Sequence, residues 1–376
     1  MSNNPISINI VETKQDFNDF LLLPWKIYKG SEFWVPPLIS QVKETLDVNK
    51  YPFWLHARRE LYIARQNGET VGRIAAIVDD NHNKFHEEKM GFFGFFESIN
   101  DIEVAGTLFD QAKKWCKEQG MTHMRGPASP SLNDECAFLL EGFNMKPTFM
   151  MPYTPKYYIN LSESYGLKKS KDLLALLKYT KWGIPSRFEK MALRVKKKYP
   201  ELKIRSFNLN NFDVEVPKLI KVYNSAWEKN WGFVPMTYEE MLHTAKSIKM
   251  FGDPDLIKIA EIDGKAVGIG ITVPNLNEVL EKLNGKLGPI EMLKFLYYKN
   301  KVKGMRTLIG GTIKEYRNTG IIAAIYYETE LGVARGKKYE WSELGWNLED
   351  NYLINEFDMA AGAKIYKKYR LYEMEI

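Results

Sequence analysis

The chain has 376 residues, of which 45% are apolar and 27% are charged, and its formal net charge is +6. This length suits two domains that each bury a core, and the charge is too small for a dedicated nucleic-acid surface, so we expect no specific nucleic-acid partner. No apolar run approaches the roughly 18 residues of a transmembrane helix, no signal peptide is recognisable, and the two cysteines have no metal-ligand spacing, which together predict a reduced, cytoplasmic setting.

Two β-hairpins dominate the predicted elements. Residues 6–10 alternate as a strand and 15–30 predict a helix, after which residues 61–78 predict a hairpin that turns at Asn67-Gly68. Residues 256–273 repeat this pattern and turn at Asp263-Gly264. Both central residues of a type I′ turn need a positive φ, so Asn-Gly and Asp-Gly are strong hairpin signals. The separation of roughly 200 residues indicates a duplicated domain and not a short-period solenoid.

The region after the first hairpin contains a pair of histidines. His82 and His86 lie in a polar stretch, residues 79–90, for which we expect a loop. They have no accompanying ligand set at zinc spacing, so we expect no metal. Residues 91–97 predict a short apolar strand, and Asn100 with Glu103 predicts a capping box that opens a helix. Residues 121–160 follow a long path broken by prolines, which is typical of functional loops.

The duplication gives a predicted division of the chain. We expect a first domain over residues 1–180, a connecting helical region over 181–200 and a second domain over 201–376. The second domain carries a helical insert at about 275–304, in which Met, Leu, Phe and Tyr residues mix with lysines. This insert could be a lid, a dimer contact, a basic amphipathic surface for a membrane or acyl chains, or an ordinary packed element.

A strand, a glycine turn and a helix follow one another over residues 305–325. The strand at 305–313 leads into Arg317-Asn318-Thr319-Gly320, and a helix is predicted from about residue 320. Free backbone N–H groups at a helix N-terminus, with a glycine that permits close approach, favour a pyrophosphate. The same turn could equally use its glycine for geometry alone.

This order of elements resembles the GCN5-related N-acetyltransferase (GNAT) superfamily, and residues 363–371 (Ala-Lys-Ile-Tyr-Lys-Lys-Tyr-Arg-Leu) are similar to that family's closing motif. The chain looks like an uncharacterised bacterial tandem GNAT protein. The resemblance implies an α/β (α+β) fold of two tandem GNAT-like (acyl-CoA N-acyltransferase) domains, each a mixed, mostly antiparallel sheet flanked by helices. It also implies acetyl-CoA or another acyl-CoA as co-substrate, and no metal.

The resemblance assigns roles to particular residues. The pantetheine arm would lie against Thr312 and Ile313, and Tyr366 would be the general acid on the last helix. The pyrophosphate would be held by Arg317, Asn318, Thr319, Gly320 and Ile321. From its own position at a strand beside this region, Glu343 could be the base, or it could be a salt-bridged structural glutamate.

Some residues depart from the family pattern. Ile322 stands where the family has a small residue, and Arg370 replaces the closing glycine. The first domain has Asp101 and Glu103 at its corresponding helix start, where carboxylates would repel a pyrophosphate, and Ser162 in place of the tyrosine. We therefore expect the first domain to be a scaffold or acceptor-binding domain without a cofactor site.

An aromatic cluster could line the floor of an acceptor cleft or belong to the core. It is formed by Trp227, Trp231 and Phe233. The leading hypothesis is an N-acyltransferase that moves an acetyl or acyl group from acyl-CoA to an amine of an unknown small-molecule or peptide acceptor. The alternatives are a non-catalytic GNAT-fold protein for ligand binding or assembly, and an aminoacyl transferase that resembles the FemABX group. The sequence is compatible with a homodimer.

Overall fold

A computed structural model describes residues 5–336 and 338–376. Their contacts divide the chain into two units. The first unit contains residues 1–173, 283–291 and 367–376, and the second contains residues 174–282 and 292–366.

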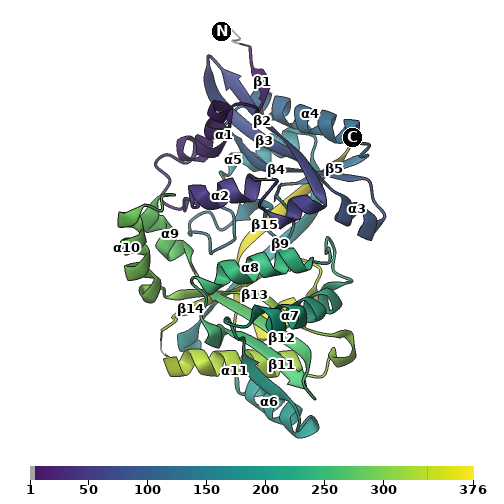
Figure 1. The fold of residues 1–376 in the computed structure, drawn as a ribbon, viewed down its shortest axis with the longest axis vertical. Coiled ribbons are helices and arrows are strands. Elements are labelled where there is room, and N and C mark those ends of the chain that lie inside the picture. The colour runs from purple at the N-terminus through teal and green to yellow at the C-terminus, as the bar shows by residue number, and fades with distance from the viewer. Residues whose placement is uncertain (1–4, 337) are drawn as a thin grey trace. The chain divides into compact units, whose positions relative to one another are not determined.

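The first unit is built on one mixed sheet, in which neighbouring strands follow the order β1, β2, β3, β4, β5, β15 (Figure 1). β4 and β5 run parallel, the other neighbours along this order run antiparallel, and β8 also pairs with β15. The strands of the unit are β1 (Ser7–Ile10), β2 (Ala57–Gln66), β3 (Glu69–Asp79), β4 (Met90–Ser98), β5 (His123–Gly126), β6 (Ala128–Ser129), β7 (Glu135–Cys136), β8 (Phe138–Glu141), the first half of β9 (Lys168–Tyr179) and most of β15 (Lys364–Glu375). β6 and β7 pair only with each other, as a separate small sheet. Its helices are α1 (Lys14–Ile27), α2 (Ile39–Leu46), α3 (Asp80–His86), α4 (Ile102–Glu118) and α5 (Tyr157–Tyr165).

The second unit repeats this plan. Its neighbouring strands follow the order β10, β11, β12, β13, β14, antiparallel except for the parallel pair β13 and β14. The strands are β10 (Lys203–Ser206), β11 (Ile257–Ile262), β12 (Lys265–Pro274), β13 (Gly304–Thr312) and β14 (Trp341–Leu348). The helices are α6 (Ser186–Lys198), α7 (Phe212–Trp227), α8 (Tyr238–Lys249), α9 (Asn277–Leu283), α10 (Pro289–Tyr298, whose first three residues belong to the first unit), α11 (Ile321–Gly336) and α12 (Tyr352–Ala360).

Both predicted hairpin turns are confirmed, with positive φ at Asn67, Gly68, Asp263 and Gly264. Gly72 and Gly268 both lie where a helix packs closely on the sheet. A Cβ on Gly72 would lie 2.6 Å from Leu108 of α4, and one on Gly268 would lie 3.0 Å from Ile325 of α11. Each glycine thus lets the long helix of its unit approach the sheet closely, which explains why the duplication keeps it.

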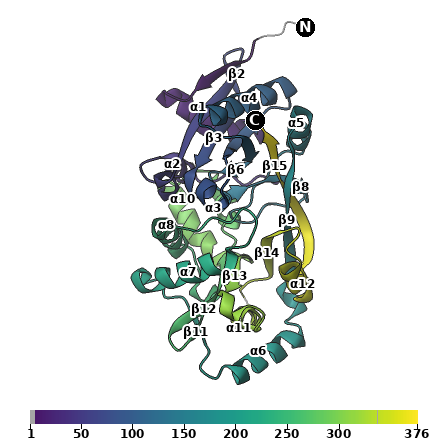
Figure 2. The ribbon, with the colours of Figure 1, turned by 90° about the vertical axis from the view of Figure 1, so that its right-hand side faces the viewer.

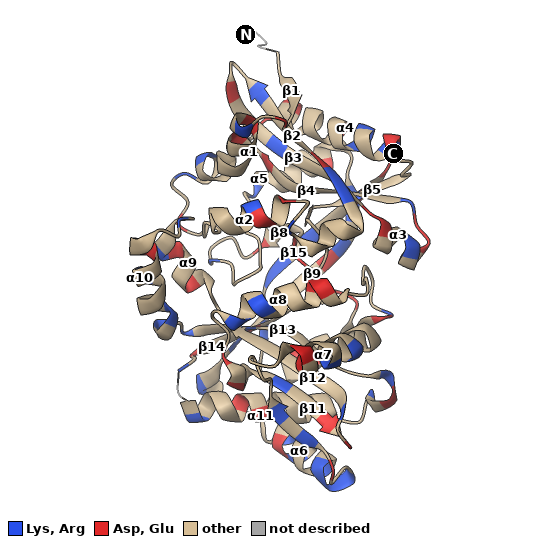
Figure 3. Ribbon diagram, in the orientation of Figure 1, with Lys and Arg blue, Asp and Glu red and all other residues tan. Residues whose placement is uncertain are grey.

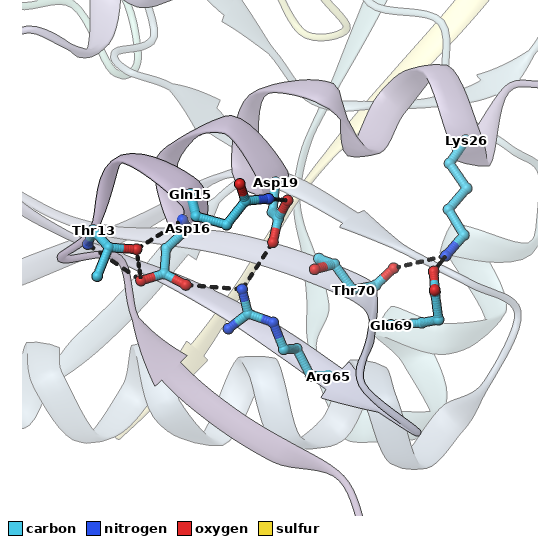
Figure 4. A network of polar contacts seen from close by, with 8 residues as sticks. All are labelled: Thr13, Gln15, Asp16, Asp19, Lys26, Arg65, Glu69 and Thr70. Carbon is cyan, nitrogen blue, oxygen red and sulfur yellow. Dashed lines mark hydrogen bonds and ion pairs between the residues drawn. The ribbon is translucent and has the colours of Figure 1, made fainter.

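Helix α1 is fastened to the hairpin of the first unit by a polar network (Figure 4). Thr13 and Asp16 form a capping box, and Arg65 of β2 donates 2.8 Å hydrogen bonds to the carboxylates of Asp16 and Asp19. The Thr13 hydroxyl, and next the Arg65 guanidinium, stabilise the charged carboxylate and lower the pKa of Asp16 to about 2.

The compact units differ from the predicted domain ranges at the end of the chain. Residues 367–376 belong to the first unit, where β15 pairs with β5 and β8 (Figure 2). Residues 283–291 of the expected insert also belong to the first unit, where Trp25 Nε1 donates to Asn284 Oδ1 at 3.1 Å. Residues 1–4 of the predicted first domain lie outside the described residues.

Three local predictions were wrong. The cap of α4 is Asp101, whose carboxylate accepts from the N–H groups of Glu103 and Val104, and not Asn100 in a capping box with Glu103. The stretch around His82 is helix α3 and not a loop, because Asp79 caps it by accepting a 2.9 Å hydrogen bond from the N–H of Asn81. Tyr366 lies in strand β15 and not in a closing helix, since the last helix, α12, ends at Ala360.

Candidate functional site

The parallel strands β13 and β14 separate partway along their length. They pair only from Gly304 to Thr307 on β13 and from Trp341 to Leu344 on β14, although β13 continues to Thr312. Residues 307–311 are all partly exposed. Among the described residues, no strand pairs with this backbone edge of β13 beyond Thr307, which is where an extended ligand could add to the sheet.

Backbone groups of two β13 residues face this opening. The N–H of Ile313 donates to the carbonyl of Val267 at 3.0 Å, so Ile313 is turned toward β12. Because successive residues of a strand direct their backbone groups to opposite sides, Gly310 and Thr312 direct theirs away from β12. Of the two residues predicted to hold pantetheine, Thr312 therefore fits this role and Ile313 does not.

The turn after β13 leads directly into α11. Asn318 and Gly320 have positive φ values of 60° and 87°, and the first turn of α11 contains no acidic residue. The N–H of Ala324 donates to the carbonyl of Gly320, whereas the N–H groups of the first helical residues have no carbonyl one turn earlier. Ile321 is fully buried, so its backbone and not its side chain could contact an anion.

The Arg317 side chain has a partner of its own. Its Nη2 donates to the carbonyl of Ser225 at 2.7 Å and lies 3.6 Å from a carboxylate oxygen of Glu228. This contact joins the turn to the C-terminal end of α7. The guanidinium carries five donor hydrogens and is one-third exposed, so it retains donors for a phosphate while it holds α7.

The departure at Ile322 has a structural use. Its Cδ1 atom lies 3.4 Å from the position that a Cβ on Gly310 would occupy. Ile322 thus packs against β13 in the space that Gly310 leaves open. The small residue of this contact is therefore Gly310 on the strand, and not a residue on the helix.

The two residues predicted to be catalytic are in direct contact. The Tyr366 hydroxyl donates a hydrogen bond to Oε2 of Glu343. Glu343 is fully buried on β14, and Nε of Arg306 lies 3.1 Å from its Oε1. Arg306 also donates to the carbonyl of Gly345 at 3.2 Å, at the point where the strands separate. The carboxylate is therefore ion-paired, as the structural interpretation of Glu343 requires, and it also orients Tyr366.

This triad of Arg306, Glu343 and Tyr366 lies at the sheet face opposite α11. Gly268 and Gly270 face α11, since their missing side chains admit Ile325. Side chains alternate along β12, so Val273 faces the other way, and Arg306 pairs with Val273 in the register. Helix α7 contacts β12 and β13 on this same face, because a Cβ on Gly311 would lie 2.7 Å from the Trp227 ring.

The predicted acceptor-binding aromatic residues divide between surface and core. Trp227 is partly exposed and stacks on Tyr223, with ring centroids 5.2 Å apart. Phe233 packs on the same tyrosine but is only 5% exposed, so it belongs to the core. Trp231 is partly exposed. Trp227 and Trp231 thus keep the exposure that a substrate contact needs.

Sequence reasoning missed a buried carboxylate near the same strand. Asp358 of α12 is 5% exposed and accepts a 2.7 Å hydrogen bond from Nδ2 of Asn347, which follows the separation point on β14. Burial disfavours its charged form and raises the pKa of Asp358 to about 7. The only sequence signal was an acid between the apolar residues Phe357 and Met359.

In the first unit, the corresponding opening is filled by the protein itself. β4 and β5 also stop pairing after Phe92 and Arg125. Here the backbone of Ala128 lies directly against β4, because a Cβ on Gly94 would be 1.6 Å from the Ala128 carbonyl oxygen. The Ser129 hydroxyl accepts a 2.8 Å hydrogen bond from the N–H of Phe95. The space beyond is filled by packed aromatic rings of Phe93, Phe96, Phe109, Phe138 and Tyr158.

The helix start in the first unit is also occupied. The Asp101 carboxylate accepts from the N–H groups of Glu103 and Val104, so an anion already caps α4. The Ser162 hydroxyl, at the place of the expected tyrosine, is fully buried. These contacts support the expectation of a first unit without a cofactor site.

Within the described residues, no group of three or more His, Cys, Asp or Glu side chains is arranged to hold a metal ion. His82 is 1% exposed and packs edge-on against Phe92. Burial, and next the charge of His86, lowers the pKa of His82 to about 3. No helix in the described part of the chain has both the length and the apolarity needed to cross a bilayer.

Comparisons with known proteins extend over the whole chain. No protein-family model matches the sequence. Protein YghO of Escherichia coli is 34% identical over 96% of this chain and 94% of its own length. Bacterial ceramide synthase of Caulobacter vibrioides is 31% identical over 99% of this chain and 98% of its own length.

The similar solved structures share the fold. A tandem GNAT protein from the clavulanic acid biosynthesis pathway superimposes with a TM-score of 0.60 at 10% identity, over 99% of this chain and 98% of that one. A GCN5-related N-acetyltransferase from Sphaerobacter thermophilus gives a TM-score of 0.54 at 12% identity, over 98% and 95%. These matches confirm the predicted mixed α/β fold and the tandem GNAT resemblance. The chain belongs to the family of protein YghO and bacterial ceramide synthase, and it has the tandem GNAT fold.

Proposed function

We propose that the second unit transfers an acyl group from acyl-CoA to an amine. The observation that carries this proposal is the separation of β13 from β14 beside the N-terminus of α11, a helix without acidic residues in its first turn. The pantetheine arm would bond to the backbone of Gly310 and Thr312, and the pyrophosphate would meet the N–H groups after Gly320 together with Arg317 and Asn318.

The triad supports a role in the chemical step. The amine nitrogen attacks the thioester carbonyl, a C–N bond forms, the C–S bond breaks, and the proton lost by the amine ends on the thiol. Tyr366 would pass a proton to the leaving thiolate, and Glu343 would act as a positioning residue that holds the tyrosine hydroxyl. Because Arg306 neutralises Glu343, we do not assign Glu343 as the base.

The relatives support an acceptor class. A ceramide is the amide of a fatty acid and a long-chain amino alcohol, and one relative that spans this whole chain is named bacterial ceramide synthase. We propose that the donor is a fatty acyl-CoA and that the acceptor is a long-chain amino alcohol. The partly exposed rings of Trp227, which lies on the sheet face of the triad, and of Trp231 suit an apolar acceptor.

The donor site is tested by calorimetric titration with CoA, acetyl-CoA and palmitoyl-CoA. Asn318→Asp places a carboxylate at the proposed pyrophosphate position and should weaken binding about threefold to tenfold. Asn210→Asp makes the same charge change at another exposed residue of the second unit and should leave binding unchanged. Absence of binding by the wild type, or equal effects of both variants, would refute the proposed donor site.

The reaction is tested by incubating donor and amino alcohol with the protein and measuring the amide by mass spectrometry. Amide formation that depends on Tyr366 supports the transferase. Donor binding without any amide, over a panel of amines, would instead favour the non-catalytic ligand-binding alternative.

A further inference from the structure

Helix α10 exposes a continuous apolar surface. Four of its side chains, Ile290, Leu293, Leu296 and Tyr297, are 66%, 70%, 47% and 58% exposed. At about 100° per residue, they fall on one side of the helix. Phe295 points the other way and is only 4% exposed, so it anchors the helix. We refer to these four exposed residues as the α10 apolar face.

The exposed apolar side chains of this face are unusual because they are grouped so closely. Single exposed apolar residues are normal on proteins, but a contiguous group rimmed by polar residues marks a surface that binds something. Met292 and Leu287, 38% and 40% exposed, extend the group. Packing of α10 through Phe295 alone does not explain why these side chains are apolar.

The segment that carries the α10 apolar face is rich in lysine. Residues 286–303 contain the five lysines 286, 294, 299, 301 and 303 and one acid, Glu291, so the segment contributes +4 to the chain's net charge of +6 (Figure 3). Lys303 is paired with Glu340 at 3.0 Å. Lys301 lies 3.8 Å from the centroid of the Tyr297 ring, so its charge stands directly beside the apolar surface.

The combination of apolar and basic groups favours one kind of partner. Pairing the face with the same face of a second copy would bring two lysine-rich segments together, which electrostatic repulsion opposes. An anionic bilayer satisfies both features, because apolar side chains enter the acyl boundary and lysines remain at the headgroups. Helix α10 has 10 residues, about half the length needed to span a bilayer, so it would lie in the interface plane.

We propose that α10 docks the protein on the surface of an anionic lipid bilayer. Tyr297 and the lysines would lie at the headgroup level, and Leu293 and Leu296 would enter the acyl boundary. Docking does not depend on acyl transfer. If the proposed function also holds, docking would bring the second unit to an amphiphilic amine that resides in the membrane.

The experiment is flotation of the full chain with vesicles of phosphatidylcholine, with or without phosphatidylglycerol, in the absence of any substrate. We expect binding to the mixed vesicles that weakens as salt is added. Leu293→Glu should abolish this binding. Lys294→Glu should reduce it by at least about fivefold, the factor that corresponds to ~1 kcal/mol per lysine near an anionic surface.

Leu193→Glu provides the matched control. Leu193 is 61% exposed on α6, which is also rich in lysine and arginine, and its substitution should leave binding unchanged. Equal losses in both leucine variants, equal binding to neutral vesicles, or no flotation of the wild type would overturn the proposal. A shift from dimer to monomer in Leu293→Glu, without vesicle binding by the wild type, would assign the face to a second copy instead.

Discussion

The hydroxyl of Tyr366 donates a hydrogen bond to the carboxylate of Glu343, although the two residues lie on different strands, β15 and β14. Glu343 is fully buried and Arg306 neutralises it, whereas Tyr366 is partly exposed. The tyrosine is thus the member of the triad that a substrate can reach, and the other two fix its orientation.

Replacing Tyr366 by Phe removes the hydroxyl and keeps the ring. We expect kcat for amide formation to fall by about a hundredfold or more, which is the usual contribution of a general acid. The affinity for acyl-CoA, measured by calorimetry, should not change. An undiminished kcat would show that the hydroxyl has a structural role alone.

Replacing Glu343 by Gln removes the carboxylate charge that pairs with the buried Arg306 guanidinium. We expect the free energy of unfolding in urea to fall by about 3–5 kcal/mol. Glu340→Gln is the control, because the Glu340 ion pair with Lys303 is exposed and its loss should cost below about 1 kcal/mol. Similar small costs for both variants would contradict the buried ion pair.

A matched pair of glycine substitutions compares the two openings. Gly94→Ala would push a Cβ into the Ala128 carbonyl and should destabilise the first unit by several kcal/mol or prevent folding. Gly310→Ala meets only Ile322, at 3.4 Å, so folding should persist while acyl-CoA affinity falls about tenfold. Unchanged affinity in folded Gly310→Ala would argue against pantetheine on β13.

Asp358 predicts a pH dependence of stability. Its pKa is about 7 in the folded state, against an ordinary aspartate pKa of 3.8, so between about pH 4 and pH 7 the folded state holds a proton that the unfolded state has lost. Stability therefore falls as pH rises through this window, by at most about 4 kcal/mol, and is level above it. Asp358→Asn should abolish this fall and be more stable than wild type above about pH 7.

Urea unfolding across this pH range measures the effect as the difference between wild type and variant. Asp213→Asn, at an exposed position in the first turn of α7, is the control and should follow the wild type. Parallel curves for wild type and Asp358→Asn would show that Asp358 does not hold its proton in the folded state.

The sequence predicted those features that depend on local backbone preference. Asn67-Gly68 and Asp263-Gly264 specify their turns by themselves, and the strand-to-helix turn at Gly320 was recognised for the same reason. Helix α3 could not be told from a loop by its polar composition, and its one local signal was the capping residue Asp79. The burial of Asp358 could not be predicted, since it depends on the packing of α12 against β14.

The strand identity of β15 was hidden by a buried lysine. Its buried residues alternate as Lys367, Tyr369 and Leu371, the period of a strand, but a lysine at such a position reads as exposed. Lys367 is fully buried because its Nζ donates to the carbonyls of Met145 and Lys146, at 2.9 and 2.8 Å. These partners are remote in sequence, so local patterns could not reveal them.

The position of β15 also has a consequence for how the chain acquires its structure during synthesis. The sheet of the first unit includes residues 367–376, which pair with β5 and β8. A ribosome would therefore have to deliver nearly all of the polypeptide before the first unit could complete its sheet. Until then the edge of β5 would stay uncovered, and a nascent chain cut short near residue 180 would expose it permanently.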